Sequence, residues 1–369
     1  MLTQKIRTEE LEVNMGPQHP STHGVMRIVL TLDGEVIKRA RPVIGYLHRG
    51  MEKIAERRTY FQYTPLCDRF DYLASMFNGA LYTMTLEKLA QMEVPPKAEY
   101  IRVILMELNR LSSHLVFAGT LGLDLGATTP FIYCFRERET ITDLFELAAG
   151  ARMTFNYMRP GGVAHDLPPE FDAKCRAFLK DMPGKIEEYE GLLTKNEIFK
   201  DRMVGIGTIS REDALGFSLT GPALRGSGVN YDVRRFEPYS VYNAFDFEVP
   251  VGQAGDCFAR YQCRMEEMRQ SLRIIEQALD GIPEGAHSTK VNMNFKLPAG
   301  EAYCHLESAR GDMGCYIVSD GKTSPVRMKW RAPSFSNISI LSKLLPGWKV
   351  ADAVAIIGSL DVVLGEVDR

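Results

Sequence analysis

The sequence of 369 residues contains no Cys-x-x-Cys pair, although seven cysteines are scattered along it between Cys67 and Cys315. Paired cysteines at this spacing are the usual ligands of structural zinc and of iron–sulfur clusters. We therefore expect no metal centre and no iron–sulfur cluster in this chain. An odd number of scattered cysteines also argues against a disulfide framework and predicts free thiols in a reducing compartment.

The usual nucleotide-binding patterns are missing as well. There is no Gly-x-x-x-x-Gly-Lys-Ser/Thr sequence, and no Gly-x-Gly-x-x-Gly stands between a predicted strand and a predicted helix. The two short Gly-x-Gly pairs at 205–207 and 226–228 do not make such a loop. We expect this chain not to bind a nucleotide.

No apolar run reaches the length of a membrane-spanning helix, and Asp352 and Asp361 interrupt the best one, 350–364. The net charge of −3 creates no field that would attract nucleic acid. The start of the chain carries no signal peptide and no Arg/Ser-rich transit sequence, so a bacterial protein is expected. Together these features predict a soluble protein, or one held at a membrane through partners, without nucleic acid as a partner.

Hydrophobic periodicity predicts strands near both ends of the chain and helices between them. Residues 25–43 have the pattern of a hairpin with its turn at Asp33-Gly34, and a second turn signal, Asp320-Gly321, separates two of the later strands. The region 203–252 is rich in glycine and aromatics and predicts loops. The fold class predicted is α+β, a central helix bundle with small sheets from the two ends. The expected helices cover 73–94, 101–115, 133–158, 169–195 and 258–279, and the later strands 303–307, 315–318 and 326–330.

The nine-residue stretch Gly16-Pro-Gln-His-Pro-Ser-Thr-His-Gly24 holds two of the seven histidines, His19 and His23. Its prolines and glycines favour a tight, fixed loop, which suits a site that holds a small molecule. The alternative is a plain turn whose histidines bond to nearby backbone. The His-x-x-x-His spacing alone permits a metal, but no third ligand lies nearby in the sequence.

Two further polar stretches are candidates. Tyr63-Thr-Pro-Leu-Cys-Asp-Arg-Phe-Asp-Tyr72 opens the first long predicted helix, where Asp68 or Asp71 could cap the helix and pair with Arg69. In Leu121-Gly-Leu-Asp-Leu-Gly126, the acid Asp124 stands among leucines and needs a cationic or hydrogen-bonding partner. Each of these stretches also has a purely structural interpretation.

Together, five motifs resemble one family along essentially the whole chain: the D subunit of NADH–quinone oxidoreductase, respiratory complex I, whose mitochondrial counterpart is the 49-kDa subunit. The motifs are the 16–24 loop, Tyr46-Leu-His-Arg-Gly-Met-Glu52, Asp68-Arg-Phe-Asp-Tyr72, Gly150-Ala-Arg-Met with Arg159-Pro-Gly-Gly-Val163, and Gly365-Glu-Val-Asp-Arg369.

The family is related to the large subunit of nickel–iron hydrogenases, which binds nickel through two Cys-x-x-Cys pairs. By this resemblance, the fold is hydrogenase large-subunit-like and the four cysteine positions are Met51, Ile54, Val363 and Glu366. These side chains cannot replace four thiolates. The resemblance therefore implies that the nickel pocket has become a site for the headgroup of a quinone.

The same resemblance assigns roles to individual residues. His23 and Tyr72 match the pair that hydrogen-bonds the quinone headgroup, and both side chains are able to donate a proton as quinone becomes quinol. Asp124 matches the acid that pairs with the histidine, and a carboxylate there would favour imidazolium. Loss of that charge on reduction would release Asp124, a first step towards ion pumping. His19 is expected to support the loop.

Arg49 and Arg69 match arginines near the terminal [4Fe–4S] cluster of the neighbouring B subunit, where positive charge stabilises the reduced cluster. One position departs from the family pattern: many relatives have a histidine where this chain has Thr154. A hydroxyl does not titrate near neutrality, so a weaker pH dependence of the cluster midpoint potential is expected. The remaining histidines, His114, His165, His287 and His305, are expected to be structural.

The resemblance implies a catalytic component of complex I that acts only within the assembly. It is expected to be one domain over 1–369, with a β-rich region over 1–70, a helical core over 71–285 and a β/α region over 286–369. Its expected partners are the B, C, I and H subunits, with NAD(H) bound by another subunit, at the cytoplasmic side of the inner membrane. The alternatives are a related complex fed by ferredoxin or reduced F420, a hydrogenase large subunit, and a non-catalytic scaffold.

Overall fold

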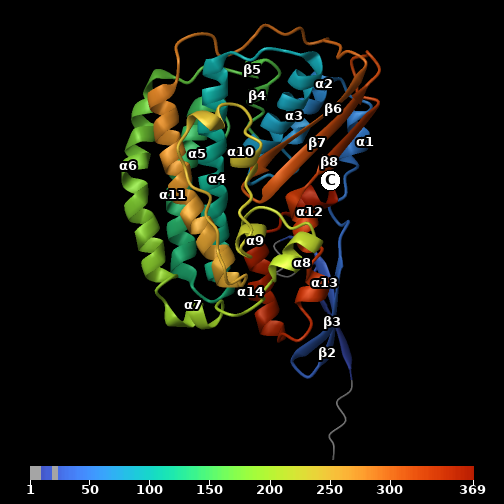
Figure 1. Ribbon diagram of the computed structural model, residues 1–369, viewed down its shortest axis with the longest axis vertical. Helices are drawn as coiled ribbons and strands as arrows, with labels where there is room; N and C mark the ends of the chain where they lie inside the picture. Colours follow the sequence, from blue (N-terminus) through green and yellow to red (C-terminus); the bar gives the residue numbers. More distant parts are fainter. Residues whose placement is uncertain (1–9, 19–23) are drawn as a thin grey trace, which may run out of the picture.

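The computed structural model describes residues 10–18 and 24–369. Long helices pack side by side on one side of the molecule, and the two three-stranded sheets lie on the other side (Figure 1). This separation of helices from antiparallel sheets is an α+β arrangement, which confirms the predicted fold class. The long helices of the bundle are α4 (Pro96–Asp124), α5 (Thr128–Ala149), α6 (Pro169–Leu192) and α11 (Cys257–Gly281).

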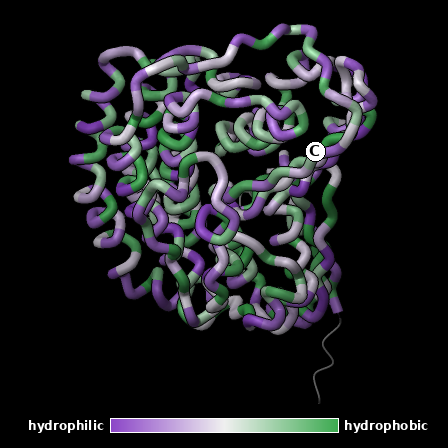
Figure 2. Tube along the Cα trace, turned by 45° about the horizontal axis from the view of Figure 1, so that its top comes forward, coloured by the Kyte–Doolittle hydropathy of each residue, from purple (hydrophilic) through white to green (hydrophobic). Residues whose placement is uncertain are grey.

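Helix α4 forms the centre of the bundle, because α5 and α11 pack against it and nearly all its residues up to Gly122 are buried. It begins with Pro96, whose missing N–H costs nothing in the first turn of a helix. Helix α6 lies at the outer edge, and hydrophilic and hydrophobic residues alternate along it (Figure 2). A helix was predicted there over 169–195, and the structure confirms it.

Helix α5 was predicted over 133–158, and this prediction is wrong at both ends. The helix starts at Thr128 and stops at Ala149, because Gly150 takes a left-handed conformation with φ 68°. The following segment contains Thr154 and Asn156, both with positive φ, so it cannot be helical. A short antiparallel pair then follows, β4 (Met158–Arg159) with β5 (Gly162–Val163).

The first sheet has the order β1-β2-β3 and is antiparallel throughout. The predicted hairpin is confirmed, with Asp33 opposite Val36 across its turn. Alternate residues Ile28, Leu30 and Leu32 are buried, as the period of two in a strand requires. The preceding strand was not predicted. The strands are β1 (Leu11–Met15), β2 (Arg27–Asp33) and β3 (Val36–Val43).

The second sheet, of order β6-β7-β8, confirms the three later strands; β6 and β7 are longer than predicted, and β8 is shifted by one residue. Strands β6 and β7 are joined by the tight turn at Ala309-Arg310, and Gly311 follows with φ 131°. Short helices then bring the chain back towards the first sheet. These elements are β6 (Gly300–Ser308), β7 (Gly311–Ser319), β8 (Arg327–Arg331), α12 (Pro333–Ile338), α13 (Leu341–Leu344), α14 (Val350–Leu360) and α15 (Leu364–Asp368).

The remaining described elements are shorter than the bundle helices. Four of them lie in the region 203–252 predicted as loops, and α3 confirms the helix predicted over 73–94. A single cluster of buried hydrophobic residues extends from Met15 to Val367 through the bundle and both sheets. The division of the chain at residues 70 and 285 stays a prediction. Among the described residues, no helix is both long and apolar enough to cross a membrane. The short elements are α1 (Met51–Ala55), α2 (Tyr60–Cys67), α3 (Ser75–Ala90), α7 (Glu197–Asp201), α8 (Arg211–Gly216), α9 (Pro222–Arg225), α10 (Val233–Phe236) and a 3₁₀ turn at Tyr242–Ala244.

Candidate functional site

Tyr72 lies in the connection between α2 and α3, and the neighbouring Asp71 holds this connection in place. One carboxylate oxygen of Asp71 accepts the backbone N–H groups of Leu73 and Ala74, at 3.1 and 3.2 Å. Burial, and then the charge of Asp71, raise the pKa of Tyr72 above its ordinary value. The phenol is therefore protonated at neutral pH and available as a hydrogen-bond donor.

The C-terminal segment packs directly on Tyr72. A Cβ atom at Gly365 would lie 3.3 Å from Cε1 of Tyr72 and only 2.6 Å from the carbonyl oxygen of Phe70. Only a residue without a side chain permits this approach. The end of the chain thus forms one wall of the space around the Tyr72 ring.

The predicted histidines His19 and His23 lie outside the described residues. Gly24, which follows them, is described, and a Cβ there would lie 3.6 Å from Cγ of Leu364. Leu364 precedes the Gly365 that packs on Tyr72. Gly24, at the end of the predicted loop, and Tyr72 therefore lie next to adjacent residues of α15, Leu364 and Gly365.

The structure brings Arg49 and Arg69 together beside this wall. The guanidinium of Arg49 donates to the carbonyl oxygen of Arg69 at 2.9 Å and to that of Gly365 at 3.1 Å. Arg69 in turn donates to the carbonyl oxygen of Pro65. Both arginines are exposed in this chain, so their positive charge faces outward next to Tyr72.

The two acids of the 63–72 stretch do not pair with Arg69 as the structural interpretation expected. Asp71 forms its ion pair with Arg310 at 2.7 Å, and Asp68 accepts the backbone N–H of Asn156. Helix α3 has no side-chain cap, because its N-cap residue is Ala74. Burial raises the pKa of Asp68 to about 6, although Asn156 and Arg69 oppose this shift.

Asp124 lies away from Tyr72. Asn109 of α4 bonds to the backbone of both Leu73 and Met76, at 2.9 and 3.0 Å, so this stretch of α4 is level with Tyr72. Asp124 is the last residue of the same helix, fifteen residues further on, which is about 22 Å along the helix axis. Direct contact between Asp124 and Tyr72 is thereby excluded.

Thr154 is half-buried in the segment after α5. Its hydroxyl donates to the carbonyl oxygen of Met153 at 2.7 Å, and its φ is 54°. The bond between Asn156 and Asp68 ties this segment to the Tyr72 connection. Thr154, where the family resemblance led us to expect a histidine, therefore lies two residues from Asn156, which contacts the titratable carboxyl of Asp68.

Sequence reasoning missed the buried ionic cluster behind Tyr72. Arg310 donates to Asp71 at 2.7 Å and to the hydroxyl of Ser113 at 3.0 Å, and lies 3.6 Å from Asp361. Arg310 is completely buried. The available signal was an arginine at a tight turn between two predicted strands, a position where a charged side chain is normally solvated.

A second buried ionic network fills the middle of the bundle. Arg225 binds Glu267 and Glu307, and Glu107 lies between Arg110 and Arg234. His114 joins this network through its Nε2, 2.8 Å from Glu267, and burial lowers its pKa. These are core contacts, although Nδ1 of His114 and Nε of Arg225 have no hydrogen-bond partner among the described residues.

His305, in contrast, links Asp312 to Glu237, and the hydrogen bond with Asp312 raises its pKa. His165 and His287 offer their backbone carbonyl groups to Tyr157 and Val163. The contacts of all four histidines are structural in kind.

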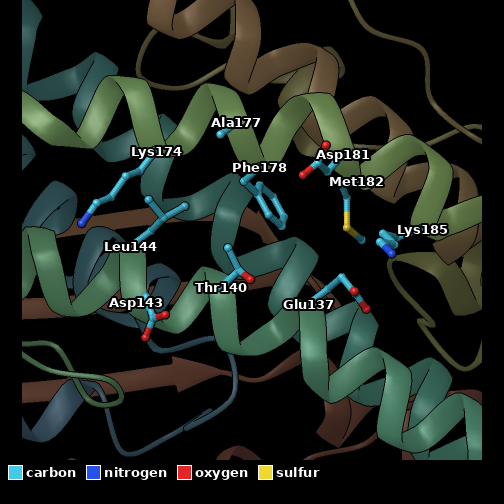
Figure 3. A pocket seen from close by; sticks show the side chains of 10 residues that line it. All are labelled: Glu137, Thr140, Asp143, Leu144, Lys174, Ala177, Phe178, Asp181, Met182 and Lys185. Atoms are coloured by element: carbon cyan, nitrogen blue, oxygen red, sulfur yellow. The ribbon is translucent and has the colours of Figure 1, made fainter.

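A surface pocket of about 360 Å³ lies elsewhere on the molecule. It is formed between α5 and α6, and Figure 3 shows Phe178 and Met182 of α6 facing Thr140 and Glu137 of α5. None of the residues predicted for the site lines this pocket. The polar side chains of this groove do not converge on one point as those of a binding site do. The candidate site is therefore the region around Tyr72.

All seven cysteines are free, and among residues 10–18 and 24–369 no group of three or more His, Cys, Asp or Glu side chains is placed to hold a metal ion. Met51, Val363 and Glu366, at positions matched to hydrogenase cysteines, are buried. Their side chains offer no set of soft ligands for nickel.

Comparison with known proteins defines the class first. A family model described as the 49 kDa subunit of respiratory-chain NADH dehydrogenase matches residues 124–294 and 286–369. Proteins named as the D subunit of NADH-quinone oxidoreductase from Desulforamulus reducens and Geobacillus kaustophilus are 55% and 54% identical over 363 and 364 residues, and the alignments cover 98% of this chain and 99% of each relative. The D subunit of Bacillus thuringiensis is 53% identical over 364 residues, 98% of this chain and 100% of the relative. The chain belongs to the 49 kDa subunit family of respiratory NADH dehydrogenases.

Proposed function

We propose that this chain is the quinone-reducing core subunit of an NADH:quinone oxidoreductase. The relatives carry that activity in their names and match this chain over nearly its whole length. The structural support is the meeting of Tyr72, the end of the 16–24 loop and α15 around Gly365. In this proposal, Tyr72 and His23 bind the two sides of the quinone headgroup.

The proposed chemistry follows from the proton-donating groups of Tyr72 and His23. Reduction of a quinone to a quinol takes two electrons and two protons, and a hydrogen-bond donor stabilises the oxyanion that develops on each carbonyl oxygen. The raised pKa of Tyr72 keeps its proton in place until the quinone oxygen gains charge. His23 supplies the second proton, and Asp124 favours its charged form before reduction and is released afterwards.

Electrons come, in this proposal, from a [4Fe–4S] cluster held by the B subunit. Arg49 and Arg69 are exposed on the outside of the site wall, where they face a partner that docks there. Positive charge at that place stabilises the reduced cluster and raises its potential. His19 supports the loop that carries His23.

The remaining partners follow from the family. The C and I subunits complete the peripheral arm, the H subunit opens the quinone path from the membrane, and NAD(H) is bound by another subunit. The assembly lies at the cytoplasmic side of the bacterial inner membrane, and quinone reduction there is coupled to ion translocation.

Replacement of Tyr72 by Phe tests the proposal. The variant keeps the ring that packs on Gly365 but removes the phenolic proton. The quinone reductase activity of the complete complex should therefore fall by about a hundredfold, a typical contribution of general acid catalysis to the rate. Electron transfer from NADH to an artificial acceptor should stay at its native value. Native quinone reductase activity in this variant would rule out Tyr72 as a proton donor.

A further inference from the structure

Three buried carboxyl groups gather behind Tyr72 around a single guanidinium. Arg310 lies 2.7 Å from Asp71 and 3.6 Å from Asp361. The third carboxyl, Glu366 of α15, interacts electrostatically with Arg310 and Asp71, and Arg310 also interacts with Tyr72. The cluster and the phenol therefore share one electrostatic environment.

The charges in this cluster balance only if one acid is neutral. Arg264 of α11 is the second buried cation within ion-pair distance of these acids, with its Nε 3.7 Å from Asp361. The buried Arg260 beside it donates instead to Ser359 and to two backbone carbonyl groups. Burial lowers the pKa of Arg264 to about 10, so it is still charged at neutral pH. Three carboxylates would face two guanidiniums, and an unbalanced buried charge is costly.

The other cations nearby are engaged elsewhere. Arg49 is exposed and donates to the backbone carbonyl groups of Arg69 and Gly365. Arg331, which lines a small cavity together with Glu366, pairs with Asp312. Neither of these arginines forms an ion pair with Glu366 among the contacts of the described residues.

Glu366 is the acid whose contacts suit the neutral form, because Asp361 lies within 3.7 Å of both Arg310 and Arg264. One carboxyl oxygen accepts the backbone N–H of Ser334 at 2.9 Å, and the other is buried without a hydrogen-bond partner among the described residues. Asp71, by comparison, binds two backbone N–H groups and Arg310. Burial, and then the charge of Asp71, raise the pKa of Glu366 to about 8.

Glu366 is also the direct neighbour of a residue that packs on Tyr72. It follows Gly365, which packs on the edge of the Tyr72 ring. The cavity that Glu366 lines with Phe70 and Trp330 has a volume of about 10 Å³, close to the space that one water molecule needs. Tyr72 does not line this cavity, so the link between Glu366 and the phenol is through Gly365 and through the shared neighbours Asp71 and Arg310.

We propose that Glu366 holds a proton behind Tyr72 and returns it to the phenolate after Tyr72 has protonated the quinone. This inference rests on the proposed function. In the first step the O–H bond of Tyr72 breaks as the reduced quinone oxygen takes its proton. In the second, the O–H bond of Glu366 breaks and that of Tyr72 forms again. Glu366 then regains a proton from solvent, and no electrons move in these last two steps.

The direction of the second step is favourable. The pKa of Glu366 is about 8, whereas burial raises that of Tyr72 above its ordinary value near 10, so the proton moves to the stronger base. The carboxylate that remains lies near Arg310, whose Nε and Nη2 have no hydrogen-bond partner among the described residues, and the cost of the third buried negative charge favours its reprotonation from solvent. Glu366 acts through Tyr72 and does not touch the quinone itself.

The test replaces Glu366 by Gln in the complete membrane-bound complex. Gln has the size of the neutral acid and still accepts the N–H of Ser334, so a purely structural role would be preserved. The proposal expects quinone reductase turnover to fall by about tenfold or more, within the range of proton-transfer effects, with artificial-acceptor activity unchanged. Because only protonated Glu366 donates, native activity should decline as the pH rises through about 8, and Glu366→Gln should lack this decline.

A matched control is Glu307→Gln. Glu307 is also a buried glutamic acid, with a pKa raised by burial to about 7, but its carboxyl binds Arg225 in the other network. This control should keep native quinone turnover. An equal loss in both variants, or native turnover and an unchanged pH profile in Glu366→Gln, would overturn the proposal.

Two further measurements keep the outcome clear. If Glu366→Gln does not assemble, Glu366→Asp retains a titratable acid, and its alkaline decline should persist; an Asp variant without any alkaline decline would refute the proposal. The Tyr72→Phe variant distinguishes a failure of the role proposed for Glu366 from a failure of the role proposed for Tyr72. Loss in Tyr72→Phe with native behaviour in Glu366→Gln rejects the proton store alone, whereas native turnover in Tyr72→Phe rejects the proposed role of Tyr72 as a proton donor, on which the proton store rests.

Discussion

Burial controls the charge of individual acids around this site. Asp68 and Glu366 are both buried, and this environment raises their pKa values to about 6 and about 8. An acid with a raised pKa takes up its proton at a higher pH in the folded chain than in the unfolded one. Above pH 8 both groups are ionised, and the folded state then carries the full cost of burying them.

A redox titration between pH 6 and 8 tests the consequence of Thr154. Threonine does not titrate in this range, so the midpoint potential of the partner's cluster should vary by clearly less than the about 59 mV per pH unit of a one-proton, one-electron couple. Any residual slope should come from Asp68, the carboxyl that holds this segment through Asn156, and should disappear in Asp68→Asn, which can still accept that N–H.

The control for this experiment is Thr154→His compared with Thr154→Asn. Both residues tolerate the left-handed backbone found at this position, but only histidine titrates near neutrality. The slope should rise in the histidine variant alone. A full one-proton slope in the native complex would show that the hydroxyl has not removed the proton coupling.

Most single residues of the site could be chosen from sequence only through the family motifs. In the structure, Arg49 contacts Arg69 and the Gly365 that packs on Tyr72, and the roles of these residues stay predictions. Arg310 could not be found this way, because its importance comes from complete burial between carboxyl groups on other segments. Periodicity gives no signal for a buried arginine at a turn.

At the level of elements, local sequence signals predicted helices and strands well where a single residue type decides the conformation. The Asp33-Gly34 turn closes the first hairpin as predicted, whereas α4 extends from Pro96 to Asp124, beyond both ends of the predicted helix 101–115. The end of α5 was missed because Gly150 was treated as an ordinary helical residue, although it takes the left-handed conformation of a helix end. Strand β1 has no clear alternation of buried residues, so the pattern did not reveal it.

Gly365→Ala is the sharpest test of how α15 meets the Tyr72 connection. The new Cβ would lie 2.6 Å from the carbonyl oxygen of Phe70, so one backbone segment must move, at a cost of about 1–3 kcal/mol in stability. Quinone reductase activity should fall by about tenfold, because a displacement near 1 Å already disturbs catalytic geometry. Thermal inactivation of the complex and its turnover would be measured together.

The matched control is Gly184→Ala in α6. A Cβ at that helical position meets nothing within 4 Å, and alanine is the better helix former. This variant should keep native turnover and be equally or more heat-stable. If Gly365→Ala were as active and stable as this control, the close packing of α15 on Tyr72 would not be needed for activity or stability.

At the scale of the whole molecule, the site combines segments that lie far apart in sequence. Gly24 near one end of the chain, Tyr72 between two helices, and Gly365 near the other end meet in one place. No pattern within a segment predicts which segments will meet, since that depends on the packing of the entire core. The order of the predicted elements was enough to predict the α+β class. The place where Gly24, Tyr72 and Gly365 meet could be located only with the family resemblance and the structure.

The most direct test is a structure of the assembled complex with quinone bound. The account predicts a headgroup between the 16–24 loop and α15, with one carbonyl oxygen about 2.6–3.2 Å from the hydroxyl oxygen of Tyr72. A headgroup bound elsewhere, for example in the groove between α5 and α6, with Tyr72 out of hydrogen-bond reach, would contradict it.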